Sequence, residues 1–292
     1  NLLNKGNIPI YEPGLEEILK KNYKQKRLIF TSDLKEAVNN SDIIFICVGT
    51  PTKNNSNSAD LKYVFNVVHE LKKIIFKYKI IVTKSTVPVT TGDKIEKILL
   101  KLKKKKLVDV VSNPEFLREG EAISDFTKPD RVIIGTESKK ANTKMKSLYM
   151  PIIKKNSRYF NTSRRGAELI KYASNAFLAT KISYINELAN LCEKAGVDIK
   201  DISQGMGSDL RIGERFLRAG PAYGGSCFPK DTRALIDIGN HFKTDLSIIK
   251  TVIASNDKRK FLFIKKMEEI LHGKLKNKTI TFLGVTFKPN TD

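Results

Sequence analysis

The chain has 292 residues, 40% of them hydrophobic, and a formal net charge of +22 at pH 7. This length suits two domains and a fragment of a third. No apolar run is long enough to cross a bilayer and no signal segment opens the chain, so we expect a soluble protein with no membrane partner. Three cysteines are too few for a disulfide framework, which predicts a reducing, cytoplasmic environment. Because Asn1 lies within a pattern, we expect further residues before it.

The excess of lysine leaves open a non-catalytic protein that binds nucleic acid or another polyanion. That alternative predicts tight, salt-sensitive binding. Against it, lysines are scattered along solvated helix faces, as at 72–73 and 101–106, and no nucleic-acid-binding signature occurs. We therefore predict no nucleic-acid partner, although a basic surface would attract anionic nucleotides.

The first half alternates between short apolar runs and helical patterns. This alternation predicts an α/β fold with a parallel sheet covered by helices on both faces. Asp33 and Asp60 are expected to cap the helices that follow them. The expected strands are 28–30, 43–48, 79–83, 107–111 and 131–135, and the expected helices are 14–23, 33–40, 60–77, 91–104 and 138–150.

The second half is helical in pattern. Residues 164–195 form one long amphipathic pattern that ends at Gly196 and predicts a spine suited to a dimer face. Further helices are expected at 198–206, 230–241 and 246–271, and residues 280–285 are expected to form the first strand of a new unit.

Polar residues follow two neighbouring apolar strands. Val48, Gly49, Thr50 and Pro51 follow the strand expected at 43–48, and the segment 84–88 follows the next one. Carboxyl ends of parallel strands share one edge of a sheet, where ligands bind in such folds. The alternative is a pair of plain turns, but two such ends side by side favour a cofactor groove.

Two further pairs are spaced by four residues. Glu115 and Glu119 would share a face on a helical turn and could act as acid and base, unless they are ordinary surface charges. Lys171 and Asn175 lie on the long helix among apolar residues. They could stabilise an oxyanion, or the lysine could extend to water.

Cys227 is the strongest candidate for a nucleophile. Cys47 is expected to be buried in a strand and Cys192 in or near a helical core, whereas Cys227 lies in a glycine-rich loop. A helix opening at Pro229 would favour the thiolate, Lys230 adds positive charge, and Asp231 is within reach as a base. No metal site is predicted, because none of the three histidines is spaced with Cys or Asp as ligands require.

These segments occur in the same order in the UDP-glucose/GDP-mannose dehydrogenase family, which the chain resembles over its whole length. The matching segments are 9–15, 45–51, 85–88, 113–120, Lys171 with Asn175, and 224–231 (Gly-Gly-Ser-Cys-Phe-Pro-Lys-Asp). The amino-acid sequence of residues 224–231 is most similar to that of family members that act on UDP-glucose.

The resemblance implies a Rossmann-type NAD-binding domain at 1–161 without its first strand and glycine-rich turn. A central helical dimerisation domain at 162–272 and the start of a C-terminal UDP-sugar domain at 273–292 would follow. The implied reaction is the four-electron oxidation of UDP-glucose to UDP-glucuronate with NAD, through a thiohemiacetal and a thioester on Cys227. The implied partner is a second copy, giving a homodimer. We expect the 292 residues alone to be inactive.

The family pattern also implies roles for residues. Lys171 and Asn175 would hold the oxyanion, Asp231 would position or activate water, and Glu115 would assist thioester hydrolysis. Thr86 and Glu119 would border the nicotinamide, and Arg211 would reach the partner's substrate. The implied cofactor set is Val48, Gly49, Thr50, Pro51, Thr86, Glu119 and Lys230. The implied substrate set is Glu115, Phe116, Leu117, Arg118, Glu119, Lys171, Asn175, Arg211, Phe216, Leu217, Tyr223, Gly224 and Cys227.

Two positions depart from the family pattern. Thr90 and Ala222 stand where glycine is usual, and we expect slight crowding at both. Two rival hypotheses remain. One is a relative that oxidises GDP-mannose or an N-acetylated UDP-sugar by the same chemistry. The other is a 3-hydroxyacid or 6-phosphogluconate dehydrogenase, which needs no nucleophilic cysteine.

Overall fold

The computed structural model describes residues 2–53, 56–153, 157–284, 288 and 290–291. The chain forms two compact units. Unit 1 comprises residues 1–51, 59–171 and 286–292, and unit 2 comprises residues 52–58 and 172–285. Within the described ranges, no helix combines the length and the hydropathy that a membrane span requires.

Unit 1 is built on one sheet whose strands lie in chain order. Parallel pairs join β1 to β2, β2 to β3, and β4 to β5, whereas β4 runs antiparallel to β3. The strands are β1 (Ile43–Ile46), β2 (Lys79–Thr83), β3 (Val108–Ser112), β4 (Arg131–Gly135) and β5 (Arg158–Thr162). The fold is the predicted α/β class, and the antiparallel step corrects the expectation of an all-parallel sheet.

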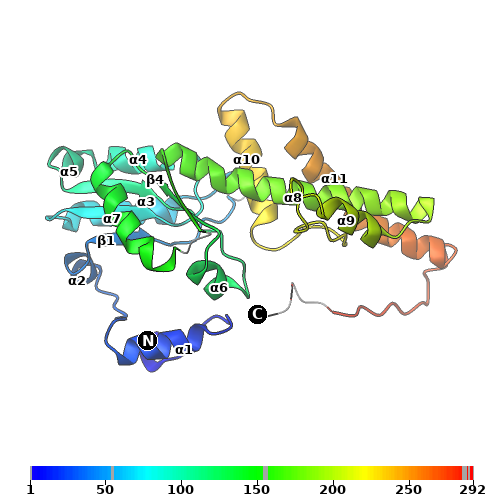
Figure 1. Cartoon of the computed structure of the whole chain (residues 1–292), viewed down its shortest axis with the longest axis horizontal. Coiled ribbons are helices and arrows are strands. Elements are labelled where there is room, and N and C mark those ends of the chain that lie inside the picture. The colour runs from blue at the N-terminus through cyan, green and yellow to red at the C-terminus, as the bar shows by residue number, and fades with distance from the viewer. Residues whose placement is uncertain (1, 54–55, 154–156, 285–287, 289, 292) are drawn as a thin grey trace. The chain divides into compact units, whose positions relative to one another are not determined.

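Alternate residues of the strands face opposite sides of the sheet, as the pleat requires. Ile81 and Val110 pack with α3 and α4 on one face, while Ile80, Val82 and Val111 pack with α7 on the other. The predicted covering of both faces is therefore confirmed, and Figure 1 shows the helices flanking the strands. The helices are α1 (Leu15–Lys24), α2 (Leu34–Asn39), α3 (Lys62–Ile74), α4 (Thr91–Ile98), α5 (Leu100–Lys104), α6 (Ala122–Thr127) and α7 (Lys139–Tyr149), with 3-10 turns η1 (Leu3–Lys5) and η2 (Met150–Ile152).

Several predicted elements of unit 1 need correction. Residues 28–30 form no strand, because Ile29 is exposed and no described strand lies beside it. The expected helix at 91–104 is divided at Leu99, and both α6 and β5 form where no element was expected. Cys47 is exposed rather than buried, since it lies just beyond the end of β1, which is at one edge of this sheet.

Helix caps follow the sequence more closely. The Asp33 carboxylate accepts a hydrogen bond from the Glu36 amide at the start of α2. Asp60 accepts one from the Lys62 amide, the first residue of α3, although Leu61 occupies the cap position itself. Each contact provides an acceptor for one of the otherwise unpaired amides of a helix start.

Unit 2 is helical. Helix α8 (Arg164–Ala195), whose residues 164–171 belong to unit 1, matches the predicted long helix at both ends. Gly196 follows it at a φ of 70°, the left-handed conformation that ends many helices. The remaining helices are α9 (Ile199–Gly207), α10 (Phe228–His241) and α11 (Ser247–Ile270). Cys192 is buried on α8, as expected.

The strand expected at 280–285 does not form in its described part. Residues 280–284 have no strand conformation, and Ile280, Phe282 and Leu283 are exposed, so no neighbouring strand pairs with them. Val285 lies outside the described residues.

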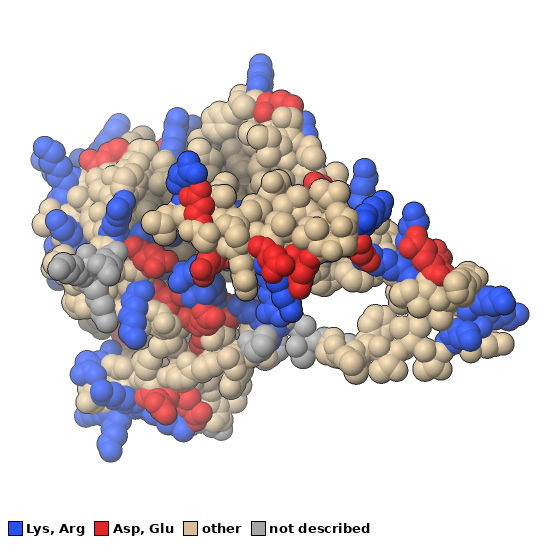
Figure 2. Space-filling model, turned by 45° about the vertical axis from the view of Figure 1, so that its right-hand side comes forward, with Lys and Arg blue, Asp and Glu red and all other residues tan. Residues whose placement is uncertain are grey.

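Lysine and arginine are dispersed over the visible face of the molecule, with aspartate and glutamate between them (Figure 2). The lysines at 72–73 are exposed at the end of α3, as expected for a solvated helix face.

Candidate active site

The carboxyl ends of β1 and β2 are tied together by side-chain hydroxyls. Ser85 Oγ donates to the carbonyl of Val48 at 2.6 Å, and Thr50 Oγ1 donates to the carbonyl of Thr86 at 2.8 Å. The two segments therefore lie side by side, as predicted for a cofactor groove. Thr86 also lines a small cavity of about 10 Å³ that it shares with Lys171, roughly the smallest volume that holds one water molecule.

The backbone at this sheet edge leaves open space for a dinucleotide. A Cβ atom added at Gly49 would meet nothing within 4 Å, so the backbone there is open to a ligand. Pro51 is exposed beside it, and the hydroxyl of Thr50 is already engaged with the neighbouring strand end. Val48, Gly49, Thr50 and Pro51 can therefore offer mainly backbone and apolar surface to a bound cofactor.

Lys171 is buried on α8 and paired with a carboxylate. Its Nζ donates to Glu115 Oε1 at 2.9 Å, and the side chain is only 5% exposed. It therefore does not extend to water. The other oxygen of Glu115 accepts from the Leu117 amide at 2.6 Å, which fixes the carboxylate on both sides. Phe116 lies beneath Lys171, with 5.3 Å from Nζ to the ring centroid.

Glu115 and Glu119 do not share a helical face. Residues 113–118 have no helical conformation, and Glu119 is exposed while Glu115 turns toward Lys171. Helical spacing fails here because Pro114 lies two residues after the end of β3 and Gly120 takes a left-handed φ of 79°. Arg118, also exposed, is engaged in a bidentate contact with Asp125 of α6.

Cys227 occupies the N-cap position of α10 and is half-buried. Its carbonyl accepts from the Asp231 amide at 2.8 Å, and Ser226 Oγ lies 3.6 Å from its Sγ. Pro229 falls in the first turn, as the sequence predicts for a helix opening there. The thiol is thus at the positive end of a helix dipole.

Asp231 is 1% exposed and is held by two side chains. Asn175 Nδ2 donates to Oδ2 at 2.6 Å, and Lys230 Nζ donates to Oδ1 at 2.7 Å. Asn175 belongs to α8, four residues after Lys171, and is itself buried. One helix therefore carries a member of each of two buried polar clusters, Lys171 with Glu115 and Asn175 with Asp231.

The loop before Cys227 is anchored by α11. Asn256 Oδ1 accepts from the Tyr223 amide, and Asn256 Nδ2 donates to the Tyr223 carbonyl. Arg259 Nε donates to the Gly220 carbonyl at 2.6 Å. Phe216 takes a φ of 67° and packs edge-on against Phe228, and Leu217 is buried.

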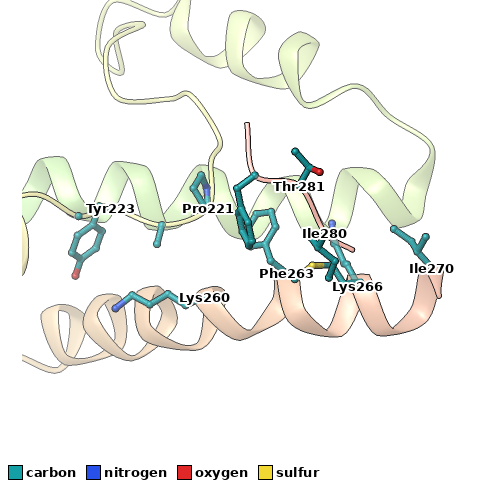
Figure 3. A pocket seen from close by; sticks show the side chains of 12 residues that line it. Pro221, Tyr223, Lys260, Phe263, Lys266, Ile270, Ile280 and Thr281 are labelled. Atoms are coloured by element: carbon teal, nitrogen blue, oxygen red, sulfur yellow. The ribbon is translucent and has the colours of Figure 1, made fainter. Parts of the chain in front are cut away.

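Tyr223 and Gly224 line a groove of about 800 Å³ in unit 2, together with Ala222. Figure 3 shows Phe263 and Ile270 of α11 on one wall and the segment with Ile280 on another. Ala222 meets this groove, so its methyl group adds to an open surface. Arg211 is apart from the groove lining, highly exposed and bidentate with Asp209.

The sequence suggests crowding at Thr90, but the structure shows a strained backbone instead. Thr90 precedes α4 at a φ of 80°, the left-handed region that glycine favours, so the cost of threonine is backbone strain.

The sequence did not single out two ionisable groups of unit 1, the half-buried Lys84 and the buried Glu168. Burial lowers the pKa of Lys84 to about 8, although Glu115 acts against this effect. Burial raises the pKa of Glu168 to about 7, against hydrogen bonds from Gly92, Ser112 and Thr90 that lower it. Glu168 lies three residues before Lys171, and this helical spacing was the one signal that could have indicated it.

Comparison with known proteins places this geometry in a family. Residues 1–153 match the NAD binding domain of the UDP-glucose/GDP-mannose dehydrogenase family, and residues 165–258 match its central domain. A UDP-glucose 6-dehydrogenase of Rhizobium meliloti (strain 1021) is 48% identical over 99% of this chain and 67% of its own length. One of Pseudomonas aeruginosa is 46% identical over 99% of this chain and 65% of its own.

Solved structures agree. A UDP-glucose dehydrogenase of Pyrobaculum islandicum superposes with a TM-score of 0.87 at 38% identity, covering 93% of this chain and 63% of that one. A GDP-mannose dehydrogenase of Pseudomonas aeruginosa superposes with a TM-score of 0.69 at 32% identity, covering 94% and 63%. The chain thus spans about two thirds of the length of these relatives. It belongs to the UDP-glucose/GDP-mannose dehydrogenase family, and residues 1–153 are its NAD-binding domain.

Proposed function

We propose that the full-length protein oxidises the C6 alcohol of UDP-glucose to a carboxylate, using two NAD+ per sugar. The names of its relatives support the substrate. The observation that carries the proposal is Cys227, half-buried at the start of α10. A dehydrogenase that stops at a ketone or aldehyde has no use for a nucleophile there.

The cofactor would lie along the carboxyl ends of β1 and β2, against Val48, Gly49, Thr50, Pro51 and Thr86. When bound, NAD+ supplies a hydride acceptor. Open space at Gly49 supports close approach of the backbone to this ligand. We include Glu119 and Lys230 in the cofactor set as well. Glu119 is exposed, and Lys230 is engaged with Asp231, so each would have to adjust on binding.

Lys171 would stabilise the oxygen of the reacting alcohol and, later, of the thiohemiacetal. A buried ammonium is suited to this task, because it is already desolvated and is held by Glu115. Glu115 would accept a proton or direct water, and Thr86, which lines the same cavity as Lys171, would border the reacting carbon.

Cys227 would capture the aldehyde. The thiolate forms a C–S bond at C6 and the carbonyl oxygen takes up a proton, which gives a thiohemiacetal. Loss of a second hydride and of the hydroxyl proton converts it into a thioester. Water then adds to the thioester carbon, the C–S bond breaks, and the carboxylate and the free thiol result. Covalent capture retains the aldehyde between the two oxidations.

Asp231 and Asn175 would serve the hydrolytic step. Asp231 is buried and oriented by Asn175 and Lys230, so its carboxylate is prepositioned for a water molecule. Asn175 would complete the oxyanion site with Lys171, one helical turn away on α8.

We include seven residues in the set that would contact the sugar nucleotide: Phe116, Leu117, Arg118, Phe216, Leu217, Tyr223 and Gly224. The largely apolar groove beside Tyr223 is wide enough for a nucleotide portion of the ligand. The domain assignment by resemblance, 1–161, 162–272 and 273–292, is part of this proposal, as is a cytoplasmic location.

We propose a homodimer through α8. Phe177, Tyr184 and Leu191 recur every seven residues on this helix and are all exposed, which is the spacing of a helix-packing seam. Arg211 would then serve the partner's substrate. Sedimentation should give a dimer for the wild type and a monomer for Phe177→Asp with Leu191→Asp. The control Phe76→Asp changes an exposed aromatic outside α8 and should leave the dimer intact.

The test of function counts NADH per sugar consumed by the full-length protein. UDP-glucose, GDP-mannose and UDP-N-acetyl sugars are supplied in parallel. We expect two NADH per UDP-glucose. Cys227→Ala should lower carboxylate formation by a factor on the order of 10³ or more, whereas the matched control Cys192→Ala retains it. Two NADH with another sugar would correct the substrate, and a stoichiometry of one would contradict the covalent route.

A further inference from the structure

Glu168 is a buried carboxylate that the proposed reaction does not use. It lies on α8, one turn before Lys171, and is 3% exposed. Both of its oxygens are occupied. Oε1 accepts from the Gly92 amide at 2.7 Å and from Ser112 Oγ at 3.0 Å, and Oε2 accepts from the Thr90 amide at 2.8 Å. A buried acid with three donors is a built feature, since burying an unpaired carboxylate is costly.

Two of these donors belong to the start of α4. Thr90 is the N-cap residue of α4, yet its own side chain makes no capping hydrogen bond. The carboxylate of Glu168 takes that place from another helix and binds the amides of the N-cap and of the second helical residue. Gly92 is required for this approach, because a Cβ atom there would lie 3.0 Å from Glu168 Oε1 and 3.0 Å from Arg164 Cδ.

The third donor and the surroundings connect Glu168 to the site. Ser112 ends β3, immediately before the segment that carries Glu115. Glu168, Ser112, Thr86 and Lys171 all line the same small cavity. The segment from Thr86 to Thr90 is short, so fixing Thr90 restricts where Thr86 can lie.

We propose that Glu168 is a positioning residue, which clamps the start of α4 and the end of β3 to α8 and thereby sets Thr86 and Glu115 against Lys171. The roles of Thr86, Glu115 and Lys171 rest on the proposed function, whereas the clamp itself does not. A carboxylate suits this position because it offers acceptors on both oxygens, whereas an amide would point donor hydrogens at a backbone N–H.

The attachment of α8 to α4 does not depend on Glu168 alone. Arg164, one turn earlier on α8, forms ion pairs with Asp93 and Glu96 of α4 and with Glu137. Replacing one acceptor oxygen of Glu168 should therefore leave the two helices packed and loosen only the first turn of α4. This makes a local effect separable from unfolding.

The test compares Glu168→Gln with Glu137→Gln in the full-length protein. Glu137 also holds α8 by a carboxylate, but it does so at Arg164 rather than at α4. Hydrogen exchange should speed up about 10-fold at the amide of Thr90 or of Gly92, whichever faces the new NH2 group, in Glu168→Gln only, because one acceptor is lost. In the same variant kcat should fall about 10- to 100-fold, with both KM values within about 3-fold, as expected when reacting groups shift slightly.

Each outcome decides the inference. Unchanged exchange at Thr90 and Gly92 would overturn the clamp, whatever the activity. Faster exchange with unchanged kcat would overturn the positioning role. Equal effects of both variants on kcat, KM and melting temperature would mean a general structural role and would also overturn it. If the wild type does not oxidise UDP-glucose, the proposed function fails, but the exchange measurement still tests the clamp.

Discussion

The lysine–carboxylate pair of unit 1 and that of unit 2 are built in opposite ways. In unit 1, the Lys171 side chain is 5% exposed and its partner Glu115 is 28% exposed. In unit 2, the Asp231 side chain is 2% exposed and its partner Lys230 is 23% exposed. The distances are similar, 2.9 Å and 2.7 Å, so burial rather than contact length distinguishes the pairs. The more buried group is a cation in the pair of unit 1 and an anion in the pair of unit 2.

The charge of the more buried group determines which chemical role each pair can take. A buried ammonium can stabilise developing negative charge, and a buried carboxylate can accept a proton or orient water. The support also differs. Glu115 faces a second cation, Lys84, so it offsets two positive charges. Asp231 keeps the hydrogen bond from Asn175 and lies in the first turn of α10, where the helix dipole favours an anion. The free energy of unfolding should therefore fall more when Lys171 loses Glu115 than when Asp231 loses Lys230.

The largest expected effect is that of Glu115→Ala on stability. It leaves Lys171 buried without its carboxylate, beside the like charge of Lys84, and should lower the free energy of unfolding by about 4 kcal/mol. Urea unfolding followed by circular dichroism measures it. The control Glu121→Ala removes an exposed carboxylate from Arg118, which keeps Asp125, and should change stability by less than about 0.5 kcal/mol. Similar values for the two variants would show that water reaches Lys171.

The next largest effect is a minimum in the free energy of unfolding when it is measured as a function of pH. The pKa of Glu168 rises on folding from 4.5 to about 7, because burial disfavours the carboxylate. The folded state then holds the proton of Glu168 more tightly than the unfolded state does. The protonated Glu168 carboxyl therefore contributes fully to stability below about pH 4.5, and this contribution is lost as the pH rises to about 7. The loss is about 3 kcal/mol.

Lys84 acts in the opposite direction at higher pH. Burial lowers its pKa from 10.5 to about 8, so the unfolded state binds the proton more tightly between these values. Stability should therefore rise again from about pH 8 to about pH 10.5. Melting temperatures measured across this range test both limbs. Glu168→Gln should flatten the lower limb and Lys84→Met the upper one, and a limb that persists in its variant would contradict the assignment.

The sequence was sufficient for features that repeat or that depend on neighbours along the chain. The apolar period of 164–195 marked both ends of α8, and Pro229 marked the opening of α10. Asp33 identified the start of α2. These signals are local, so no knowledge of distant contacts was needed.

The features that failed depend on neighbours in space. Residues 28–30 have the composition of a strand but no described strand beside them, and β5 has no continuous apolar run yet pairs with β4. Glu115 and Glu119 have helical spacing, but Pro114 keeps their segment extended. Glu168 went unnoticed because its partners, Thr90, Gly92 and Ser112, lie more than 50 residues away in sequence.

The smallest expected effect comes from Lys230→Met. Asp231 remains buried, but Asn175 still donates to it and the helix start still favours its charge, so the loss of stability should be about 2 kcal/mol, roughly half that of Glu115→Ala. The matched control is Lys20→Met, whose pair with Glu16 is exposed on both sides and should contribute less than about 0.5 kcal/mol. A loss equal to that of Glu115→Ala would mean that Asn175 and the dipole provide no support. A loss as small as that of Lys20→Met would mean that Asn175 and the helix start hold Asp231 without Lys230. In that case Asp231 with Asn175, rather than the ion pair, is the unit that could activate water.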